Sequence, residues 1–131
     1  MLPLTKKKRH LIGRDGVLLL KRSYRLTKNK DFQAVYKRKN SVAAGAVVLY
    51  IKDSIKDATP RVGFSVSKKV GNAVKRNRCR RLMREAVRTN IEGIRTGKDY
   101  VFIGRQSIAK AGYKQIEKDI LRALERKGCL V

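Results

Sequence analysis

The chain has 131 residues, of which 34 are Lys or Arg and 10 are Asp or Glu, so its formal net charge is +24. Its length is typical of a single domain. Hydrophobic residues make up 42% of it, which suffices for a packed core and argues against wholesale disorder. Because such an excess of positive charge repels itself unless a polyanion is close, the composition favours a partner that is nucleic acid or an anionic membrane surface.

The residue types that carry catalysis and metal binding are scarce. Two cysteines, Cys79 and Cys129, and one histidine, His10, are too few and too scattered for a structural zinc site of about four ligands. The one close carboxylate pair, Glu117 and Asp119, lies in a helical pattern where we expect it to balance neighbouring basic residues. We therefore expect no catalytic constellation and no metal site in the protein alone. The widely spaced cysteines favour a reducing compartment, and one disulfide stays open as an alternative.

The N-terminal part, residues 1–24, is predicted to be a flexible basic extension of one domain formed by residues 25–131. It has basic runs at 6–9 and 21–22, and its apolar run at 17–20 is too short for the hydrophobic region of a signal peptide. No segment approaches the ~18 apolar residues of a membrane span. Two interpretations of the extension stay open: an arm that contacts RNA, or a solubilising tail.

Hydrophobic periodicity and turn residues predict the elements that follow. The first is a helix with Asn29 as its N-cap and Asp31 in its first turn, where a negative charge suits the helix dipole. The pattern also allows a short extra strand around residues 41–44. The predicted elements are a helix at 30–39, strands at 46–51 and 61–67, a helix from after 72 to 90, a strand at 99–105 and a helix at 113–127. This order indicates an α/β sandwich of the α+β class, with helices packed on a small mixed sheet.

The strand predicted at 61–67 has two unequal faces. Alternation puts three apolar residues on one face and the small residues Gly63, Ser65 and Ser67 on the other. Such a small face is either simply solvated or lets a bulky ligand approach the backbone closely.

The long helix carries the most concentrated charge of the folded part. Between residues 68 and 88 the chain has nine basic residues and one acid, Glu85. A helical projection turns an apolar stripe toward the core and most arginines away from it, with Arg76 nearer the stripe. The stripe consists of Cys79, Leu82, Met83, Ala86 and Val87. Cys79 is therefore interpreted as a small core residue rather than a reactive thiol.

A ridge of this helix has arginine at every fourth position: Arg76, Arg80, Arg84 and Arg88. Like charges at that spacing destabilise a helix, whereas ordinary solvated helices mix acids with bases. The planar guanidinium group matches phosphate oxygens and can stack on bases. We therefore favour nucleic-acid binding over a merely solvated face.

RNA is favoured over DNA because no short helix-turn-helix partner precedes the basic helix. Aromatic residues also lie near the small-faced strand in the predicted fold, and aromatic rings beside basic residues suit unstacked single-stranded bases. The residues concerned are Phe32, Tyr36 and Tyr50. From the pattern alone, Phe32 and Tyr36 fit ordinary core residues equally well.

The stretch from Arg61 to Ala86, with the motif Arg76-Asn77-Arg78 at its centre, closely resembles the protein subunit of bacterial ribonuclease P. The amino-terminal pattern of that family is present as well. It runs from Arg25-Leu26 through Asp31-Phe32-Gln33-Ala34-Val35-Tyr36 to Val48-Leu49-Tyr50. The resemblance covers residues 25–124, and a match of that length is far more specific than a short motif.

The resemblance implies an α-β-β-β-α-β-α sandwich similar to the second domain of a small-subunit ribosomal protein. It also implies a left-handed crossover through the basic helix, whereas such crossovers are right-handed in about 98% of proteins. The implied activity is endonucleolytic removal of the 5′ leader from precursor tRNA. The RNA subunit with bound Mg²⁺ would perform the hydrolysis, without an organic cofactor. The implied protein is a monomer within a cytoplasmic ribonucleoprotein of bacteria, bound to the catalytic RNA and precursor tRNA and not to a membrane.

The resemblance also assigns site residues by matching position. Those expected to bind the catalytic RNA are Lys68, Lys69, Arg76, Asn77, Arg78, Arg80, Arg81, Arg84 and Arg88. Those expected to line a leader-binding cleft are Phe32, Tyr36, Val48, Tyr50, Ser65, Ser67 and Lys68.

Two features depart from the family pattern. Residues 43–47 lack the polar, arginine and aromatic residues often found just before the Val-Leu-Tyr motif, so we expect weaker binding at that rim. The basic extension is also longer than usual.

The rival function is a ribosomal or other structured-RNA binder without a catalytic partner. The net charge fits this rival equally well, whereas the Arg76–Arg84 signature disfavours it. A stand-alone nuclease is disfavoured by the single histidine and the missing carboxylate cluster.

Overall fold

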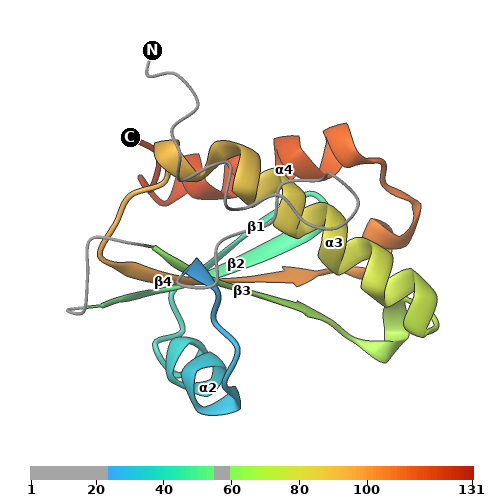
Figure 1. Cartoon of the computed structure of the whole chain (residues 1–131), viewed down its shortest axis with the longest axis horizontal. Helices are drawn as coiled ribbons and strands as arrows, with labels where there is room; N and C mark the ends of the chain where they lie inside the picture. Colours follow the sequence, from blue (N-terminus) through green and yellow to red (C-terminus); the bar gives the residue numbers. More distant parts are fainter. Residues whose placement is uncertain (1–23, 55–59) are drawn as a thin grey trace, which may run out of the picture.

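The computed structural model describes residues 24–54 and 60–131, and Figure 1 shows their arrangement. The helices and strands, in chain order, are α2 (Asn29–Lys37), β1 (Ser41–Ala44), β2 (Val47–Asp53), β3 (Arg61–Val66), α3 (Ala73–Asn90), β4 (Lys98–Gly104) and α4 (Tyr113–Arg126). Three 3₁₀ turns connect them: η2 (Lys68–Val70), η3 (Ile91–Gly93) and η4 (Gln106–Lys110). The predicted order α-β-β-β-α-β-α is confirmed, and the optional strand at 41–44 is β1.

The four strands form one sheet in the order β1-β2-β4-β3. The pairs β1–β2 and β2–β4 are antiparallel, whereas β3 and β4 are parallel neighbours joined through α3. In Figure 1 the chain rises from β3 to α3 and returns to β4 behind β3, so the crossover is left-handed as expected. Helices α3 and α4 cover one face of the sheet, and α2 lies on the other.

The main core lies between the sheet and the two long helices. Strand residues Leu49 and Phe102 are fully buried there, together with Met83 of α3 and Ile120 of α4. The apolar stripe predicted for α3 is confirmed: four of its five residues are buried, and Leu82 packs partly buried against the same core. Cys79 and Cys129 are both buried and free, so the alternative of a disulfide is wrong.

Helix α2 packs on the opposite face of the sheet through a smaller cluster. Leu26, Val35 and Val101 are its buried members. Partly buried side chains surround them: Phe32, Tyr36, Tyr50 and Ile103. Because α2 has only nine residues, it covers part of this face and leaves the rest open.

The start of α2 differs from the prediction. Lys28, and not Asn29, is the N-cap, with extended backbone angles and no side-chain cap hydrogen bond. The preceding segment pairs with the edge of the sheet, since Arg25 bridges Val62 and the Leu26 N–H donates to the Val62 carbonyl over 2.9 Å. This pairing sets where the chain can turn into the helix. Asp31 lies in the first turn as predicted.

The predicted extension, residues 1–24, lies outside the described residues except for Tyr24, which packs against the main core. The division into an extension and one domain stays a prediction. Within residues 24–54 and 60–131, no helix combines the length and apolar character needed to cross a membrane.

The close carboxylate pair on α4 has structural partners other than lysines. Asp119 is buried and accepts hydrogen bonds from the Ala46 N–H, over 3.0 Å, and from the Gln115 side chain, over 2.8 Å. Glu117 accepts a hydrogen bond from the Asn90 side chain over 3.0 Å. The interpretation that the pair balances basic residues along the helix is therefore wrong for the buried Asp119, and for Glu117, which lines a surface hollow with Lys114, Lys118 and Arg122, it stays a prediction. Asp119 holds the β1–β2 turn on α4, and Glu117 ties α4 to α3.

A partly buried ion pair joins β3 to β4. Arg61 donates to the two carboxylate oxygens of Asp99 over 3.0 and 2.8 Å, and Asp99 is only 2% exposed. The Asp31 carboxylate of α2 lies 3.9 Å from the same guanidinium group. The pair thus connects the two parallel strands at the end where α2 begins.

We predict that Asp99→Asn lowers the free energy of unfolding by about 2 kcal/mol, because a partly buried guanidinium group loses the charge of its bidentate partner and keeps the more distant Asp31 carboxylate at 3.9 Å. Chemical denaturation would measure the loss. The matched control is Asp53→Asn, which removes the 2.6 Å pair between Asp53 and Lys98 at the exposed end of β2. We expect little measurable change there. Equal stability of the two variants would contradict the prediction.

Candidate nucleic-acid interface

Helix α3 begins at a well-defined cap. Asn72 is its N-cap, and the Asn72 side chain accepts a 2.9 Å hydrogen bond from the Lys75 N–H. This cap and the buried stripe together fix the rotation of the helix about its axis, so each basic side chain has a definite direction. The predicted RNA-binding residues of α3 consequently fall into groups with different surroundings.

The exposed group lies on the outer face of α3 and contains Asn77, Arg78 and Arg81. A shallow hollow of about 560 Å³ lies along this face. Its lining consists of Val74, Asn77, Arg78, Arg80, Arg81 and Arg84. No carboxylate belongs to this lining, so the hollow is an uncompensated positive surface suited to a polyanion.

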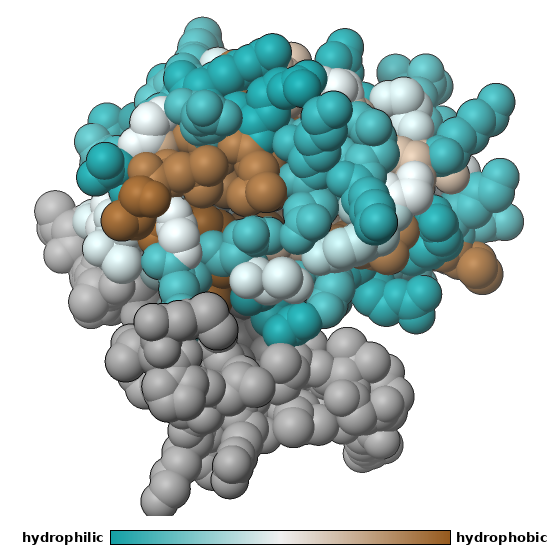
Figure 2. Space-filling view, turned by 90° about the horizontal axis from the view of Figure 1, so that it is seen from above, coloured by the Kyte–Doolittle hydropathy of each residue, from teal (hydrophilic) through white to brown (hydrophobic). Residues whose placement is uncertain are grey.

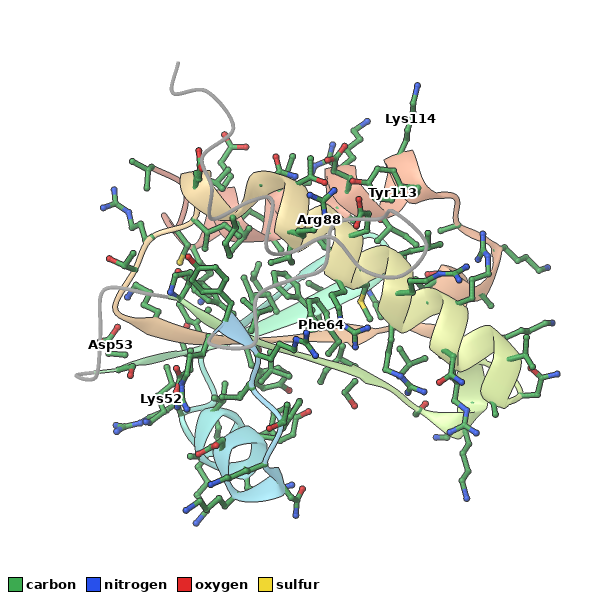
Figure 3. All side chains as sticks on the ribbon, viewed as in Figure 1. Lys52, Asp53, Phe64, Arg88, Tyr113 and Lys114 are labelled. Atoms are coloured by element: carbon green, nitrogen blue, oxygen red, sulfur yellow. The ribbon has the colours of Figure 1, made fainter. Side chains whose placement is uncertain are left out.

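Arg84 lies at the flank of the helix, above an aromatic ring of the sheet. Its guanidinium carbon is 5.9 Å from the centre of the Phe64 ring, which itself stacks on Phe102 at 6.1 Å. Figure 3 shows Phe64 beneath α3. Burial lowers the pKa of Arg84, and the positive charges of Arg25 and Arg80 lower it further. Arg84 is part of the lining of the hollow, so its guanidinium group adds positive potential there, next to a partly exposed aromatic ring.

Arg88 differs from the other arginines of the predicted ridge because it has an acidic partner. Its guanidinium group donates to both carboxylate oxygens of Glu85, one turn earlier, with a distance of 2.9 Å from Nε. The hydrogen bond from Glu85 raises the pKa of Arg88. Figure 3 shows Arg88 and Tyr113 where α3 and α4 meet. The ridge itself carries no acid, as its sequence shows, but Glu85 reaches Arg88 from a neighbouring row of the helix through an i,i+3 pair.

Arg76 approaches the apolar stripe, as the helical projection indicated. Its Nε atom is buried and is the one buried side-chain polar atom in the described residues that has no hydrogen-bond partner. The core thus reaches the first turns of α3, and Arg76 is only partly available to a ligand.

Lys68 and Lys69 are exposed on η2, between the end of β3 and the start of α3. The Lys69 carbonyl accepts a 3.5 Å hydrogen bond from Gln106 of η4. The two lysines thus extend the positive surface of α3 toward the open face of the sheet.

Four of the predicted cleft residues, Phe32, Tyr36, Tyr50 and Ser65, contact one another around α2. The Tyr36 and Tyr50 rings meet edge to face at 5.2 Å, and Phe32 lies 6.4 Å from Tyr36. Burial raises the pKa of Tyr36, and its hydrogen bond with the Ser65 side chain opposes that shift. The hydroxyl group of Tyr36 thus connects α2 to strand β3 of the sheet on which α2 packs.

The floor of this cleft is set by strand register. Val48 of β2 and Ser65 of β3 each stand opposite Ile103 of β4, so the three form one row across the sheet. Ser67 and Lys68 are exposed just beyond the end of β3. Ile103 was missed at the sequence level, although alternation along the strand predicted at 99–105 already placed it on the face opposite Phe102.

The small face of β3 is not empty at Gly63. A Cβ atom built on Gly63 would lie 2.5 Å from Cζ of Phe32, so the ring of Phe32 occupies that space. The bulky group that approaches the backbone is therefore part of this chain. Only the Ser65 end of the face is open to a ligand, and Phe32 forms a wall of the cleft.

The protein-family model described as Ribonuclease P matches residues 20–128. The chain belongs to the ribonuclease P protein family. It is 38% identical over 109 residues to the ribonuclease P protein component of Bacillus cereus strain B4264, covering 83% of this chain and 95% of the relative. It is 43% identical over 102 residues to that of Alkaliphilus oremlandii, covering 78% and 89%.

Solved structures of the family share the fold. The RNase P protein of Staphylococcus aureus superposes with a TM-score of 0.76 at 36% identity, covering 82% of this chain and 98% of that chain. Membership of the RNase P family implies a subunit of a tRNA-processing endoribonuclease that works with RNase P RNA.

We predict that Arg81→Ala weakens the affinity for RNase P RNA and lowers the slope of log affinity against log salt by about 0.7–0.9, the loss of one phosphate contact. Filter binding over a salt series would measure both quantities. Arg88→Ala is the matched control, because Glu85 already neutralises Arg88. The salt slope of Arg88→Ala should change by clearly less than that of Arg81→Ala. Equal changes in the two variants would contradict the assignment of the outer face.

Proposed function

We propose that this chain is the RNase P subunit that docks on the catalytic RNA through α3 and holds the 5′ leader of precursor tRNA in the α2 cleft. The observation that carries the proposal is the division of the surface: a carboxylate-free cationic hollow on α3, and a cluster of partly buried aromatic side chains on the other face of the sheet. The two sites lie on opposite faces of the sheet, and Lys68 and Lys69 lie between them at the end of β3.

The cleft suits a single strand rather than a duplex. Its open part has an apolar floor, Val48 and Ile103, beside the hydroxyl groups of Ser65 and Tyr36. An unstacked base can lie on such a floor and hydrogen-bond to the hydroxyl groups. The exposed Lys68 at the end of β3 would contact the phosphates that follow. A leader is the single-stranded part of precursor tRNA, so binding here would favour precursor over mature tRNA.

Hydrolysis is assigned to the RNA subunit with its Mg²⁺ ions, as in the family. Within the described ranges, no three His, Cys, Asp or Glu side chains come together to hold a metal ion. The buried carboxylates Asp99 and Asp119 already bind Arg61 and the β1–β2 turn. Mg²⁺ prefers oxygen ligands and keeps several waters, which RNA phosphates accommodate. In this proposal the protein holds the substrate and screens phosphate repulsion, as a monomer within a cytoplasmic ribonucleoprotein.

The decisive experiment is cleavage of precursor tRNA by a bacterial RNase P RNA, with and without this protein, at limiting Mg²⁺. We expect the protein to raise the rate of 5′-leader removal at low Mg²⁺ and to produce no cleavage by itself. An unchanged rate would refute the proposed partnership. Cleavage by the protein alone would place the catalytic groups in the protein.

We further predict that Phe32→Ala weakens binding of precursor tRNA by about tenfold, the order of one lost base contact, while binding of mature tRNA changes little. The variant removes the wall of the cleft over Gly63. Gln33→Ala, at an exposed position on the same helix, is the matched control and should bind both RNAs normally. Because the measured quantity is a ratio of two affinities, a general loss of stability cancels. Equal losses for both RNAs would refute the leader cleft.

A further inference from the structure

Val74 has an unusual environment for an apolar side chain. In residues 24–54 and 60–131, the exposed large hydrophobic residues are Val74, 77% exposed, and Val131, 86% exposed. Val131 ends the chain, whereas Val74 lies in the first turn of α3 among its cations. A β-branched residue does not favour helix formation, and an exposed one contributes nothing to the core. Val74 therefore adds little to the fold.

The side chains around Val74 form one continuous surface. Val74, Asn77, Arg78 and Arg81 have the spacing i, i+3, i+4, i+7 and so lie on one face of α3. They line the hollow of about 560 Å³. That volume lies within the range of roughly 300–1,000 Å³ that is usual for small-molecule sites. The hollow is large enough to take a single nucleotide.

Asn77 gives this hollow a directional hydrogen-bonding group. Its side-chain oxygen accepts a short hydrogen bond from the guanidinium group of Arg80. The amide NH₂ group is thereby left to donate to a ligand. The hollow thus combines an apolar contact at Val74, guanidinium planes at Arg78 and Arg81, and a hydrogen-bond donor at Asn77.

These groups suit a nucleobase better than a phosphate alone. Phosphates gain from the arginines but nothing from Val74. A duplex presents mainly phosphates and ribose hydroxyl groups, so its base faces are out of reach. An unstacked base can place its face on the valine and a guanidinium plane, its acceptor atoms toward the amide, and its phosphate on the remaining arginines.

We infer that an unpaired nucleotide of the RNase P RNA seats its base against Val74, between Asn77, Arg78 and Arg81. The inference rests on the proposed docking of α3 on the catalytic RNA and adds a specific contact to it. Val74 then binds by its apolar surface and not by charge.

The test compares the isosteric variant Val74→Thr with Val131→Thr, which makes the same change at the other exposed valine. Affinity for the RNase P RNA should fall about threefold to tenfold in Val74→Thr, with an unchanged salt slope, because no phosphate contact is lost. Val131→Thr should bind as the wild type does. Val74→Leu, which stays apolar, should bind within about twofold of the wild type. Chemical probing of the RNA should show one nucleotide that gains reactivity only with Val74→Thr.

Each outcome decides between the alternatives. Equal affinity of Val74→Thr and Val131→Thr, or a salt slope altered by Val74→Thr, would overturn the base contact. Arg81→Ala, measured in parallel, reports on the docking itself. A reduced slope in Arg81→Ala with normal Val74→Thr binding would remove the base contact and leave the proposed function intact. If neither variant changes RNA binding, both the base contact and the proposed docking of α3 on the RNA are refuted. Far-UV circular dichroism confirms that the exposed substitutions leave the helix folded.

Discussion

The burial of the apolar stripe of α3 against the sheet determines how the positive charge of this protein is presented. Cys79, Met83 and Val87 are at most 1% exposed, and they lock the rotation of the helix about its axis. Since each residue advances by about 100°, every other direction on the helix follows. Arg78 and Arg81 point outward, while Arg76 and Arg84 lie at the margins of the stripe and are partly desolvated. One hydrophobic contact thereby sorts chemically identical side chains into an open docking face and a flank.

The opposite face of the sheet is only partly covered, because the one helix that packs on it is short. Helix α2 has nine residues and crosses only part of the four-stranded sheet. The part under α2 is filled by Phe32 on Gly63 and by the Tyr36–Tyr50 pair. The part beyond it keeps Val48 and Ile103 accessible. The partly buried Arg61–Asp99 pair, with Asp31 of α2 nearby, holds the covered end together. The proposed cleft is thus the part of this apolar face that α2 leaves uncovered, and the residues that anchor α2 border it.

Much of the fold and part of the site could be predicted from the sequence. Period-2 and period-3.6 patterns are local, so the order of elements and the inward stripe of α3 were predictable from them. The aromatic and serine residues of the cleft were predicted through the family resemblance. The failures have a different origin. The N-cap is Lys28 and not Asn29 because Leu26 pairs with β3, and Arg88 is neutralised by Glu85 from a neighbouring row of the helix. Val74 and Ile103 escaped notice because an exposed valine and a strand isoleucine carry no distinctive pattern of their own.

By itself, the sequence determined the helices and strands, the concentration of arginines on one of them, and membership of a family, because these depend on local periodicity and on motifs of consecutive residues. The tertiary structure decided which of those arginines are open, which carboxylates are already engaged, and which end of the small face of β3 a ligand can reach. The physical reason is distance along the chain. The ring of Phe32 fills the space over Gly63, Arg84 is desolvated above Phe64, and Val48 and Ser65 share a row through Ile103. The +24 charge predicts a polyanionic partner; packing between residues far apart in the chain determines the surfaces that meet it.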